Sequence, residues 1–180
     1  MGLLNTLMEE HRGFQTMLSV LEASAARVSR GLALPDGMLP GLLDFFEYFT
    51  DGHHVREEHW LFPLLAEHGI GQDQSVVNAL LAQHDAGRVY TGKMRADVGR
   101  LAQGDASARE SVAGHATGYV ELIREHIRIE DSYFYGVAEG ILSQAEKESI
   151  SEAFGRESSS RISDTDSHSS WCRRLLRWRM

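Results

Sequence analysis

The sequence predicts an all-α protein, built as an up-down-up-down bundle of four long helices. It contains only three prolines in 180 residues, and none of them lies within the stretches 3–30, 73–102 or 106–140. In these stretches apolar residues recur every three or four positions, which is the spacing of one helix face. No segment shows the strict alternation of apolar and polar residues that indicates a strand.

The first two helices are separated by a turn-rich segment, residues 31–40. The first helix should cover residues 3–30, where His11 lies among the leucines of one face. The second helix should run from about Leu42 to His68. Pro63 should end or kink it near its last turn, because proline lacks the N–H that continues a helix.

The remaining helices follow in the second half of the chain. Two long helices are expected over residues 73–102 and 106–140, on either side of a turn that contains Gly104. A short fifth helix should cover residues 143–154, with Ser143 as its N-terminal cap. Long helices joined by short turns favour the bundle.

We expect residues 1–155 to form one domain and residues 156–180 to form a disordered tail. Residues 156–170 are mainly Ser, Asp, Arg and Thr, and this composition cannot bury a core. The last ten residues, 171–180, are basic and aromatic. For them an unstructured end is favoured over a helix that contacts a partner or a membrane surface.

The composition excludes several function classes. A net charge of −8 argues against nucleic-acid binding, which requires a basic surface. Cys172 is the single cysteine and cannot form an intrachain disulfide, so a reducing compartment is expected. We find neither a signal peptide nor an apolar run of about 18 residues that would form a transmembrane segment. We therefore expect a cytoplasmic protein.

One motif occurs twice, at residues 53–63 and again at residues 126–136. Each copy has a histidine, a glutamate four residues later, a second acid beside that glutamate, and then an aromatic and aliphatic run. A spacing of four turns a helix by only about 40°, so the imidazole and the carboxylate share one face. Two such faces, with His11 and His84 from the other two helices, would form a carboxylate-bridged dinuclear metal site.

A histidine on an apolar helix face is usually a hydrogen-bonded core residue. Four such histidines, one on each helix, together with two facing carboxylates favour a metal site, because buried charges without a cation are costly. Nitrogen and oxygen donors suit iron, zinc or manganese. The lack of ligand cysteines argues against a structural zinc site.

The second helix offers two registers, because His54 and Glu58 have the same spacing as His53 and Glu57. Apolar neighbours, among them Trp60, belong to the face of His53 and favour the first pair. His54 and Glu58 would then lie about 100° away, at the edge of the bundle.

The internal repeat supports the same choice. It aligns Glu57 with Glu130 when Phe62 is set against Tyr135, five residues further on in both copies. Tyr133 lies about one turn past Glu130, either as a core aromatic residue or as a hydrogen-bond partner of the site. We choose His53 and Glu57, and the alternative register stays open.

These motifs resemble the hemerythrin-like (HHE cation-binding) family. The resemblance covers about residues 3–140 and rests on the segments 9–12, 53–63, 84–88 and 126–131. It implies a four-helix bundle with a non-haem, carboxylate-bridged di-iron centre, two irons per chain, that meets O2, peroxide or nitric oxide. By position, the ligands it implies are four histidines and two glutamates: His11, His53, Glu57, His84, His126 and Glu130.

The chain departs from the oxygen-carrying hemerythrins, whose third helix offers a second histidine where this chain has Arg88. This departure favours redox chemistry or sensing over reversible O2 carriage. Two function classes remain. The first is a di-iron protein that consumes peroxide or nitric oxide or handles O2, and the second is an iron or oxygen sensor, or an iron store, without catalytic turnover. Whether the protein is an enzyme stays open, and no catalytic residue is assigned.

Overall fold

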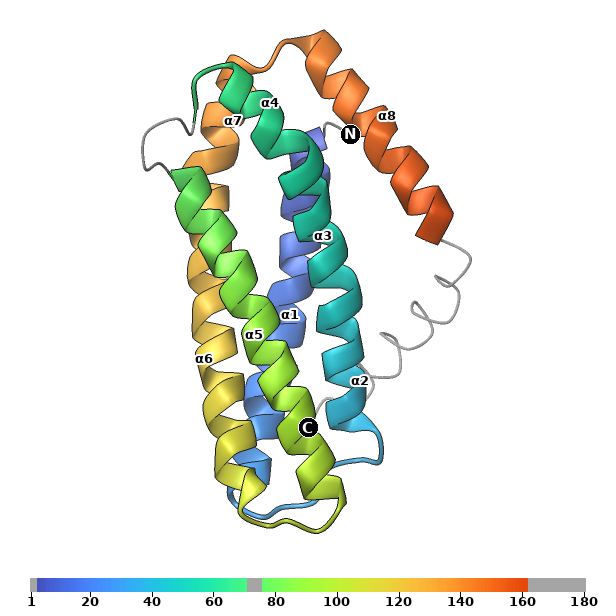
Figure 1. Ribbon diagram of the computed structural model, residues 1–180, viewed down its shortest axis with the longest axis vertical. Helices are drawn as coiled ribbons and strands as arrows, with labels where there is room; N and C mark the ends of the chain where they lie inside the picture. Colours follow the sequence, from blue (N-terminus) through green and yellow to red (C-terminus); the bar gives the residue numbers. More distant parts are fainter. Residues whose placement is uncertain (1–2, 71–75, 162–180) are drawn as a thin grey trace.

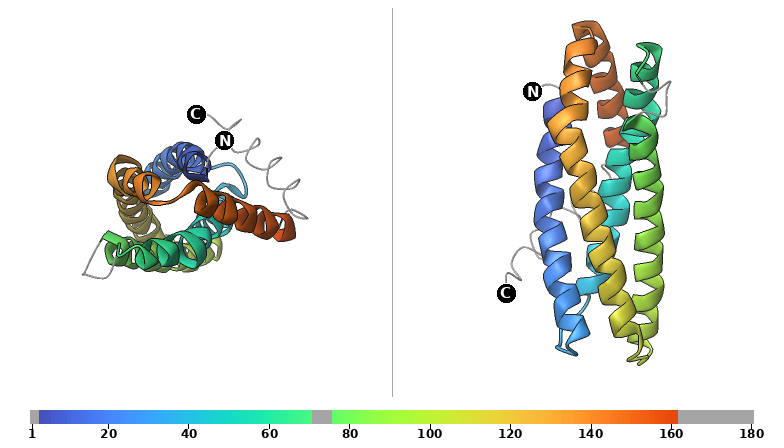
Figure 2. Two further views of the ribbon diagram at one scale, coloured as in Figure 1. Left: turned by 90° about the horizontal axis from the view of Figure 1, so that it is seen from above. Right: turned by 90° about the vertical axis from the view of Figure 1, so that its left-hand side faces the viewer.

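The computed structural model describes residues 3–70 and 76–161 (Figure 1). Within these residues every regular element is helical and none is a strand. Four long helical runs lie side by side and alternate in direction, and a further helix packs along one side of the bundle (Figures 1 and 2). The predicted all-α bundle with an additional helix is confirmed. No helix in the described part is long and apolar enough to cross a membrane.

The helical runs are close to those predicted. The second and fourth runs are continuous helices that contain π-helical turns, labelled η. In chain order the elements are α1 (Leu3–Ser29), α2 (Met38–Phe45), η1 (Phe46–Thr50), α3 (Asp51–Arg56), η2 (Glu57–Leu61), α4 (Phe62–Glu67), α5 (Val76–Ala102), α6 (Ala108–Ile129), η3 (Glu130–Phe134), α7 (Tyr135–Ile141) and α8 (Gln144–Arg161).

The turns η2 and η3 occur at equivalent points of the internal repeat. In η2 the N–H of Phe62 donates to the carbonyl of Glu57, and in η3 the N–H of Tyr135 donates to the carbonyl of Glu130. Both bonds span five residues instead of four, so each turn holds one residue more than an α-helical turn. Both π turns therefore begin at a glutamate that we predicted to be a metal ligand.

Pro63 does not end the second helical run, which continues to Glu67. Proline cannot donate the backbone hydrogen bond that an α-helix requires at this point. The irregularity that accompanies it is η2, which lies immediately before it along the chain.

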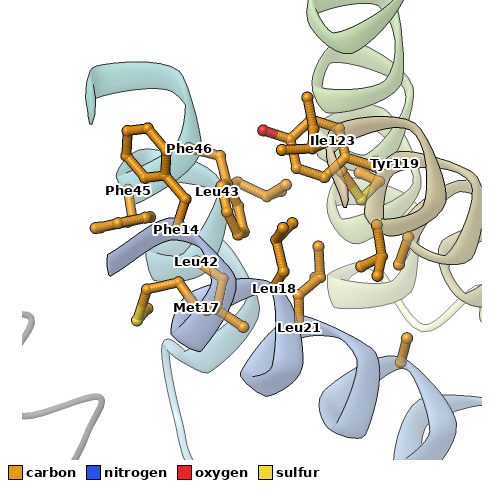
Figure 3. Close-up of a cluster of buried hydrophobic side chains, with 14 of the residues drawn as sticks. Phe14, Met17, Leu18, Leu21, Leu42, Leu43, Phe45, Phe46, Tyr119 and Ile123 are labelled. Carbon is orange, nitrogen blue, oxygen red and sulfur yellow. The ribbon is translucent and has the colours of Figure 1, made fainter. Parts of the chain in front are cut away.

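Apolar side chains fill the bundle on both sides of the predicted ligands. One cluster, drawn in Figure 3, packs Phe14 and Leu18 of α1 against Phe46 and Tyr119. A second cluster lies nearer the start of α1 and includes Leu7. The predicted ligands occupy the helix positions between the two clusters, so apolar layers close both ends of the polar layer.

The additional helix, α8, begins at Gln144 and is capped by Ser143, as predicted. The backbone N–H and the hydroxyl of Ser143 donate to the carboxylate of Glu146 at 2.8 and 2.6 Å, and the Glu146 N–H donates back to the hydroxyl at 3.3 Å. This reciprocal pair is a capping box. The helix continues to Arg161, beyond the predicted boundary at residue 155. The rest of the predicted tail, from residue 162, lies outside the described residues.

We expect the cap of α8 to depend on pH. Hydrogen bonds from the Ser143 side chain, from His68 and from the Ser143 backbone lower the pKa of Glu146 to about 2, from an ordinary value of 4.5. A carboxylate whose pKa is lower in the folded than in the unfolded state stabilises the folded state at pH values above the unfolded pKa. This stabilisation is lost as the pH falls from the unfolded pKa to the folded pKa. The packing of α8 should therefore weaken between about pH 4.5 and pH 2.

Hydrogen exchange measured across this window would check the expectation. Protection of the α8 amides should fall with pH in the wild type and should change little in Glu146→Gln, which has no titrating carboxyl at the cap. An equal fall in both proteins would show that another group controls the helix.

Candidate metal centre

All six predicted ligands are buried in one layer of the bundle. The histidines come from α1, α3, α5 and α6, and the two glutamates are the first residues of η2 and η3. Their exposed fractions are 0 or 1%, for His11, His53, Glu57, His84, His126 and Glu130. The structure thus brings together every residue of the predicted ligand set, from four separate helical runs.

One group of possible ligands consists of His11, His53 and Glu130. Nε2 of His11 lies 3.1 Å from Nε2 of His53 and 3.2 Å from Oε2 of Glu130. The same Glu130 oxygen lies 3.1 Å from Nε2 of His126. The Glu130 carboxylate therefore faces histidines of two different helices.

A second group consists of Glu57, His84, His126 and Glu130, whose ligand atoms all lie within 4.8 Å of one another. Oε2 of Glu57 is 3.6 Å from Nε2 of both His53 and His84. Glu130 belongs to both groups, and Glu57 faces one histidine of each. This is the arrangement in which two carboxylates can bridge a pair of metal ions.

Each of the four histidines has a hydrogen-bond partner at Nδ1, the ring nitrogen that faces away from the centre. Such a partner holds the proton on Nδ1 and leaves the lone pair of Nε2 directed inward, as in metal-binding histidines. The pairs are His11 with Asp131 at 2.8 Å, His53 with Glu10 at 2.8 Å, His84 with Glu58 at 2.7 Å and His126 with Gln83 at 3.1 Å.

These outer partners repeat the internal symmetry of the chain. Glu58 and Asp131 each follow a glutamate of the ligand set and each bind the histidine of a different helical run. Glu10 and Gln83 each precede a histidine of the set and bind the histidine of the next run. The acid beside the glutamate in each copy of the motif therefore orients a histidine from another helix.

Burial makes the charged state of this layer costly. Burial, and after it repulsion by the Glu57 carboxylate, raises the pKa of Glu130 to about 7. Burial lowers the pKa of His126 to about 4, so its imidazole is neutral at pH 7. Burial opposes a charge on His53, but the carboxylates of Glu57 and Glu10 raise its pKa to about 10, so in the metal-free layer a proton on His53 takes the place of a cation. Two buried carboxylates that repel each other and draw a proton onto a buried imidazole form a site that favours a cation.

Several atoms of the ligand set have no hydrogen-bond partner among the described residues. They are Oε2 of Glu57, Nε2 of His84, Nε2 of His126 and both carboxylate oxygens of Glu130. Unpaired buried polar atoms cost about 1–3 kcal/mol each, and more when charged. All of these atoms carry inward lone pairs, which metal ions would satisfy together. The residues therefore fit a pair of cations bound by nitrogen and oxygen.

His54 and Glu58 are the pair of the alternative register, and we expected both at the edge of the bundle. His54 is buried instead, and Glu58 is partly buried. His54 is only 3% exposed, and its ring stacks on that of His84 with 3.8 Å between the centroids and 12° between the planes. Glu58 is partly buried and accepts hydrogen bonds from His84 and Arg88. Our prediction was wrong for His54 because its helical run also packs against α5, so a side chain rotated away from His53 meets that helix instead of solvent.

Tyr135 is a site residue that we did not predict. It is 2% exposed, and its hydroxyl donates to Oε1 of Glu57 at 2.6 Å and lies 3.4 Å from Nε2 of His53. Tyr133, which we had considered for this position, is 59% exposed. In a regular α-helix Tyr135 would lie about 140° around the axis from Glu130. The wider turn η3 returns it to the side of the ligands.

The first copy of the motif differs from the prediction in the same way: the aromatic residue expected near the predicted ligands is exposed, and the one two positions later is buried. Trp60, which we placed on the face of His53, is 42% exposed. Phe62 is buried, and its ring centroid lies 5.8 Å from that of His84. The alignment of Phe62 with Tyr135 in the repeat was the signal that could have identified Tyr135.

Tyr135→Phe should weaken metal binding without unfolding the protein. The hydroxyl holds a Glu57 oxygen, and hydrogen-bond partners of ligands typically contribute about 10–100-fold to metal affinity. Burial and nearby carboxylates raise the pKa of Tyr135 well above its ordinary value, so it remains a donor at neutral pH. We expect zinc affinity, measured by chelator competition, to fall by at least about 10-fold. Tyr133→Phe is the matched control, and equal affinity in both variants would contradict this role.

Proteins of two mycobacteria are similar to this chain. They are the uncharacterized proteins Mb2018 of Mycobacterium bovis and Rv1995 of Mycobacterium tuberculosis, each 25% identical over 159 residues. The match covers 88% of this chain but only 62% of each relative, so the chain spans less than two thirds of their length. No solved structure matches the chain significantly.

A family model described as the hemerythrin HHE cation binding domain matches residues 2–138, a range that includes all six predicted ligands and Tyr135. The matched range also covers the four long helical runs almost completely. On its sequence, its fold and its buried cluster of histidines and glutamates, this chain belongs to the hemerythrin HHE cation-binding domain family.

Proposed function

We propose that this protein binds two non-haem irons and reacts with or senses O2, peroxide or nitric oxide. The observation that carries the proposal is the pair of ligand groups that share Glu130, with Glu57 facing a histidine of each. The donor set of nitrogen and oxygen atoms suits iron. When bound, the iron pair would supply coordination positions and electrons for a small ligand.

The residues of the chain would prepare this site in three ways. The Nδ1 partners fix the histidine rings and direct Nε2 inward. Tyr135 holds one oxygen of Glu57 and leaves the other for the metal. The apolar clusters on both sides exclude bulk water, which strengthens the interaction between the carboxylates and a cation.

We also propose that the protein is cytoplasmic and that its ligand is a small molecule and not a nucleic acid. The single cysteine fits a reducing compartment, and the net charge of −8 disfavours a phosphate backbone.

Metal analysis of protein expressed with iron, combined with its optical spectrum, tests the proposal. We expect about two irons per chain, because four histidines and two bridging glutamates oversupply a single ion. Saturation at one metal per chain would overturn the dinuclear site. Turnover of peroxide or nitric oxide by the loaded protein would make it an enzyme, whereas ligand binding without turnover would make it a sensor or a store.

A further inference from the structure

A cavity of about 270 Å³ opens beside the ligand layer, between the second helical run, α5 and α6. None of the six predicted ligands lines it, but His54 does. The ring of His54 stacks on that of His84, which is a predicted ligand. The cavity therefore meets the metal centre through His54.

His54 is a buried polar side chain that the proposed metal centre leaves without a role. It is 3% exposed, and its ring makes no hydrogen bond with any of the described residues. Its ring nitrogens are not among the fully buried atoms that lack a hydrogen-bond partner, so they keep access to solvent, and His54 lines the cavity. A molecule held in the cavity could supply the missing hydrogen bond.

Distance alone would also allow His54 to bind a metal, because its ligand atom and those of His84 and His126 lie within 4.8 Å of one another. The orientation of the rings argues against this. An imidazole binds a metal through a lone pair in the plane of its ring, and two nearly parallel rings stacked 3.8 Å apart cannot both point at one ion. His84 also has Glu58 at Nδ1 to orient it, whereas His54 has no such partner.

Two glycines of α5 leave room in the cavity. A Cβ atom added to Gly92 would meet no atom within 4 Å, and one added to Gly87 would make only ordinary contacts of 3.5 and 3.8 Å. One water occupies about 30 Å³ of liquid, so a cavity of about 270 Å³ has room for a molecule of two to four atoms together with several waters.

The charge of Arg88, which also lines the cavity, is already compensated. Its guanidinium donates to Asp51 at 2.8 Å, to Glu58 at 2.7 Å and to Asp85 at 3.1 Å. With these three carboxylates around it, Arg88 offers little net attraction to an anion. The cavity therefore favours an uncharged ligand.

We propose that this cavity is a subsite that holds a small uncharged ligand, of the class of O2, nitric oxide or hydrogen peroxide, next to the metal pair, with His54 as its hydrogen-bond partner. The inference rests on the proposed di-iron function. The cavity would give the ligand a route of entry between α5 and the second helical run. His54 would bind the ligand without binding the metal.

Filling the cavity tests the route of entry. Gly92→Leu should slow the association of nitric oxide with the reduced, iron-loaded protein by at least about 10-fold in stopped-flow absorbance, because the new side chain occupies the passage. Gly99→Leu is the matched control on the same helix, since a Cβ there also meets no atom within 4 Å and Gly99 does not line the cavity. Unchanged association in Gly92→Leu would overturn the proposed route.

His54→Phe tests the hydrogen bond, because phenylalanine keeps the stacked ring and removes both nitrogens. We expect two metals per chain as in the wild type, and faster dissociation of nitric oxide. In the zinc-loaded wild type, which is redox-inactive, added hydrogen peroxide should shift the ring ¹⁵N resonances of His54. Loss of a metal from His54→Phe, or no shift in the zinc-loaded protein, would overturn the role of His54. A wild type that fails to bind two metals would instead overturn the proposed function.

Discussion

Glu130→Gln should raise the melting temperature of the metal-free protein and at the same time abolish the stabilisation that metal binding provides. Both oxygens of this carboxylate are buried and lack hydrogen-bond partners, and the Glu57 carboxylate repels it. Glutamine has nearly the same shape without the charge, so the substitution removes the repulsion. It would also remove one of the two proposed bridging ligands, because a neutral amide binds metal ions weakly.

The direction of this effect follows from the pKa of Glu130. Its pKa is about 7 in the folded protein, above the ordinary 4.5. Between pH 4.5 and pH 7 the folded protein therefore keeps a proton on Glu130 that the unfolded protein has lost. The metal-free wild type should therefore lose stability as the pH rises from 4.5 to about 7. Each pKa unit corresponds to about 1.4 kcal/mol, which makes this a large effect for one side chain. Glu130→Gln should not show this loss.

Thermal melts with a chelator and with added zinc, recorded at several pH values, would measure both effects. A ligand at about 1,000 times its dissociation constant stabilises the folded state by about 4 kcal/mol, and the variant should lose this gain. Glu125→Gln is a suitable control, because Glu125 is exposed and pairs with Arg128. A destabilised metal-free Glu130→Gln that still gains stability from zinc would show that Glu130 is not a buried, ionised ligand.

Glu57→Ala should reduce the metal content from about two ions per chain to at most one. One oxygen of Glu57 is 3.6 Å from both His53 and His84, which belong to different ligand groups. Removal of this carboxylate leaves no residue other than Glu130 to join the groups. Zinc or iron titration followed by metal analysis would give the stoichiometry.

Glu58→Ala makes the informative comparison, because Glu58 has the same spacing from His54 as Glu57 has from His53. The sequence placed Glu58 at the edge of the bundle, where its loss would have little effect. The structure shows it at Nδ1 of His84, so we now expect two metals but an affinity lower by about 10–100-fold. Equal stoichiometric loss in both variants would mean that the two glutamates have equivalent roles.

The clustering of the six proposed ligands could be predicted because it depends on regular α-helix. His53 and Glu57 are separated by α-helical residues, as are His126 and Glu130, and the four-residue spacing places each pair on one face. His11 lies at the helical spacing of its apolar neighbours. Local periodicity therefore suffices for these positions.

The positions after each glutamate could not be predicted in the same way. Trp60 and Tyr133 lie where an uninterrupted α-helix would place them near the ligands, yet both are exposed. The π turns bring Phe62 and Tyr135 inward, where both pack in the second apolar cluster. The periodicity of an α-helix does not predict such turns.

The burial of His54 could not be predicted from the sequence either. A helical wheel gives the angle of a side chain from His53, but it does not say whether another helix lies in that direction. The stacking on His84 of α5 depends on how the helical runs pack in three dimensions.

The outer partners of the histidines would make the two proposed iron positions chemically inequivalent. The outer partners correspond by position in the two halves of the chain, Glu58 to Asp131 and Glu10 to Gln83, and among them only Gln83 is a neutral amide. A carboxylate makes its imidazole a stronger electron donor than an amide does. The position bound by His11 and His53, both with carboxylate partners, should therefore favour the ferric state more than the position that includes His126. Partial oxidation should leave the electron localised on the His126 side, which two distinct sets of Mössbauer lines would reveal and which Gln83→Glu should diminish.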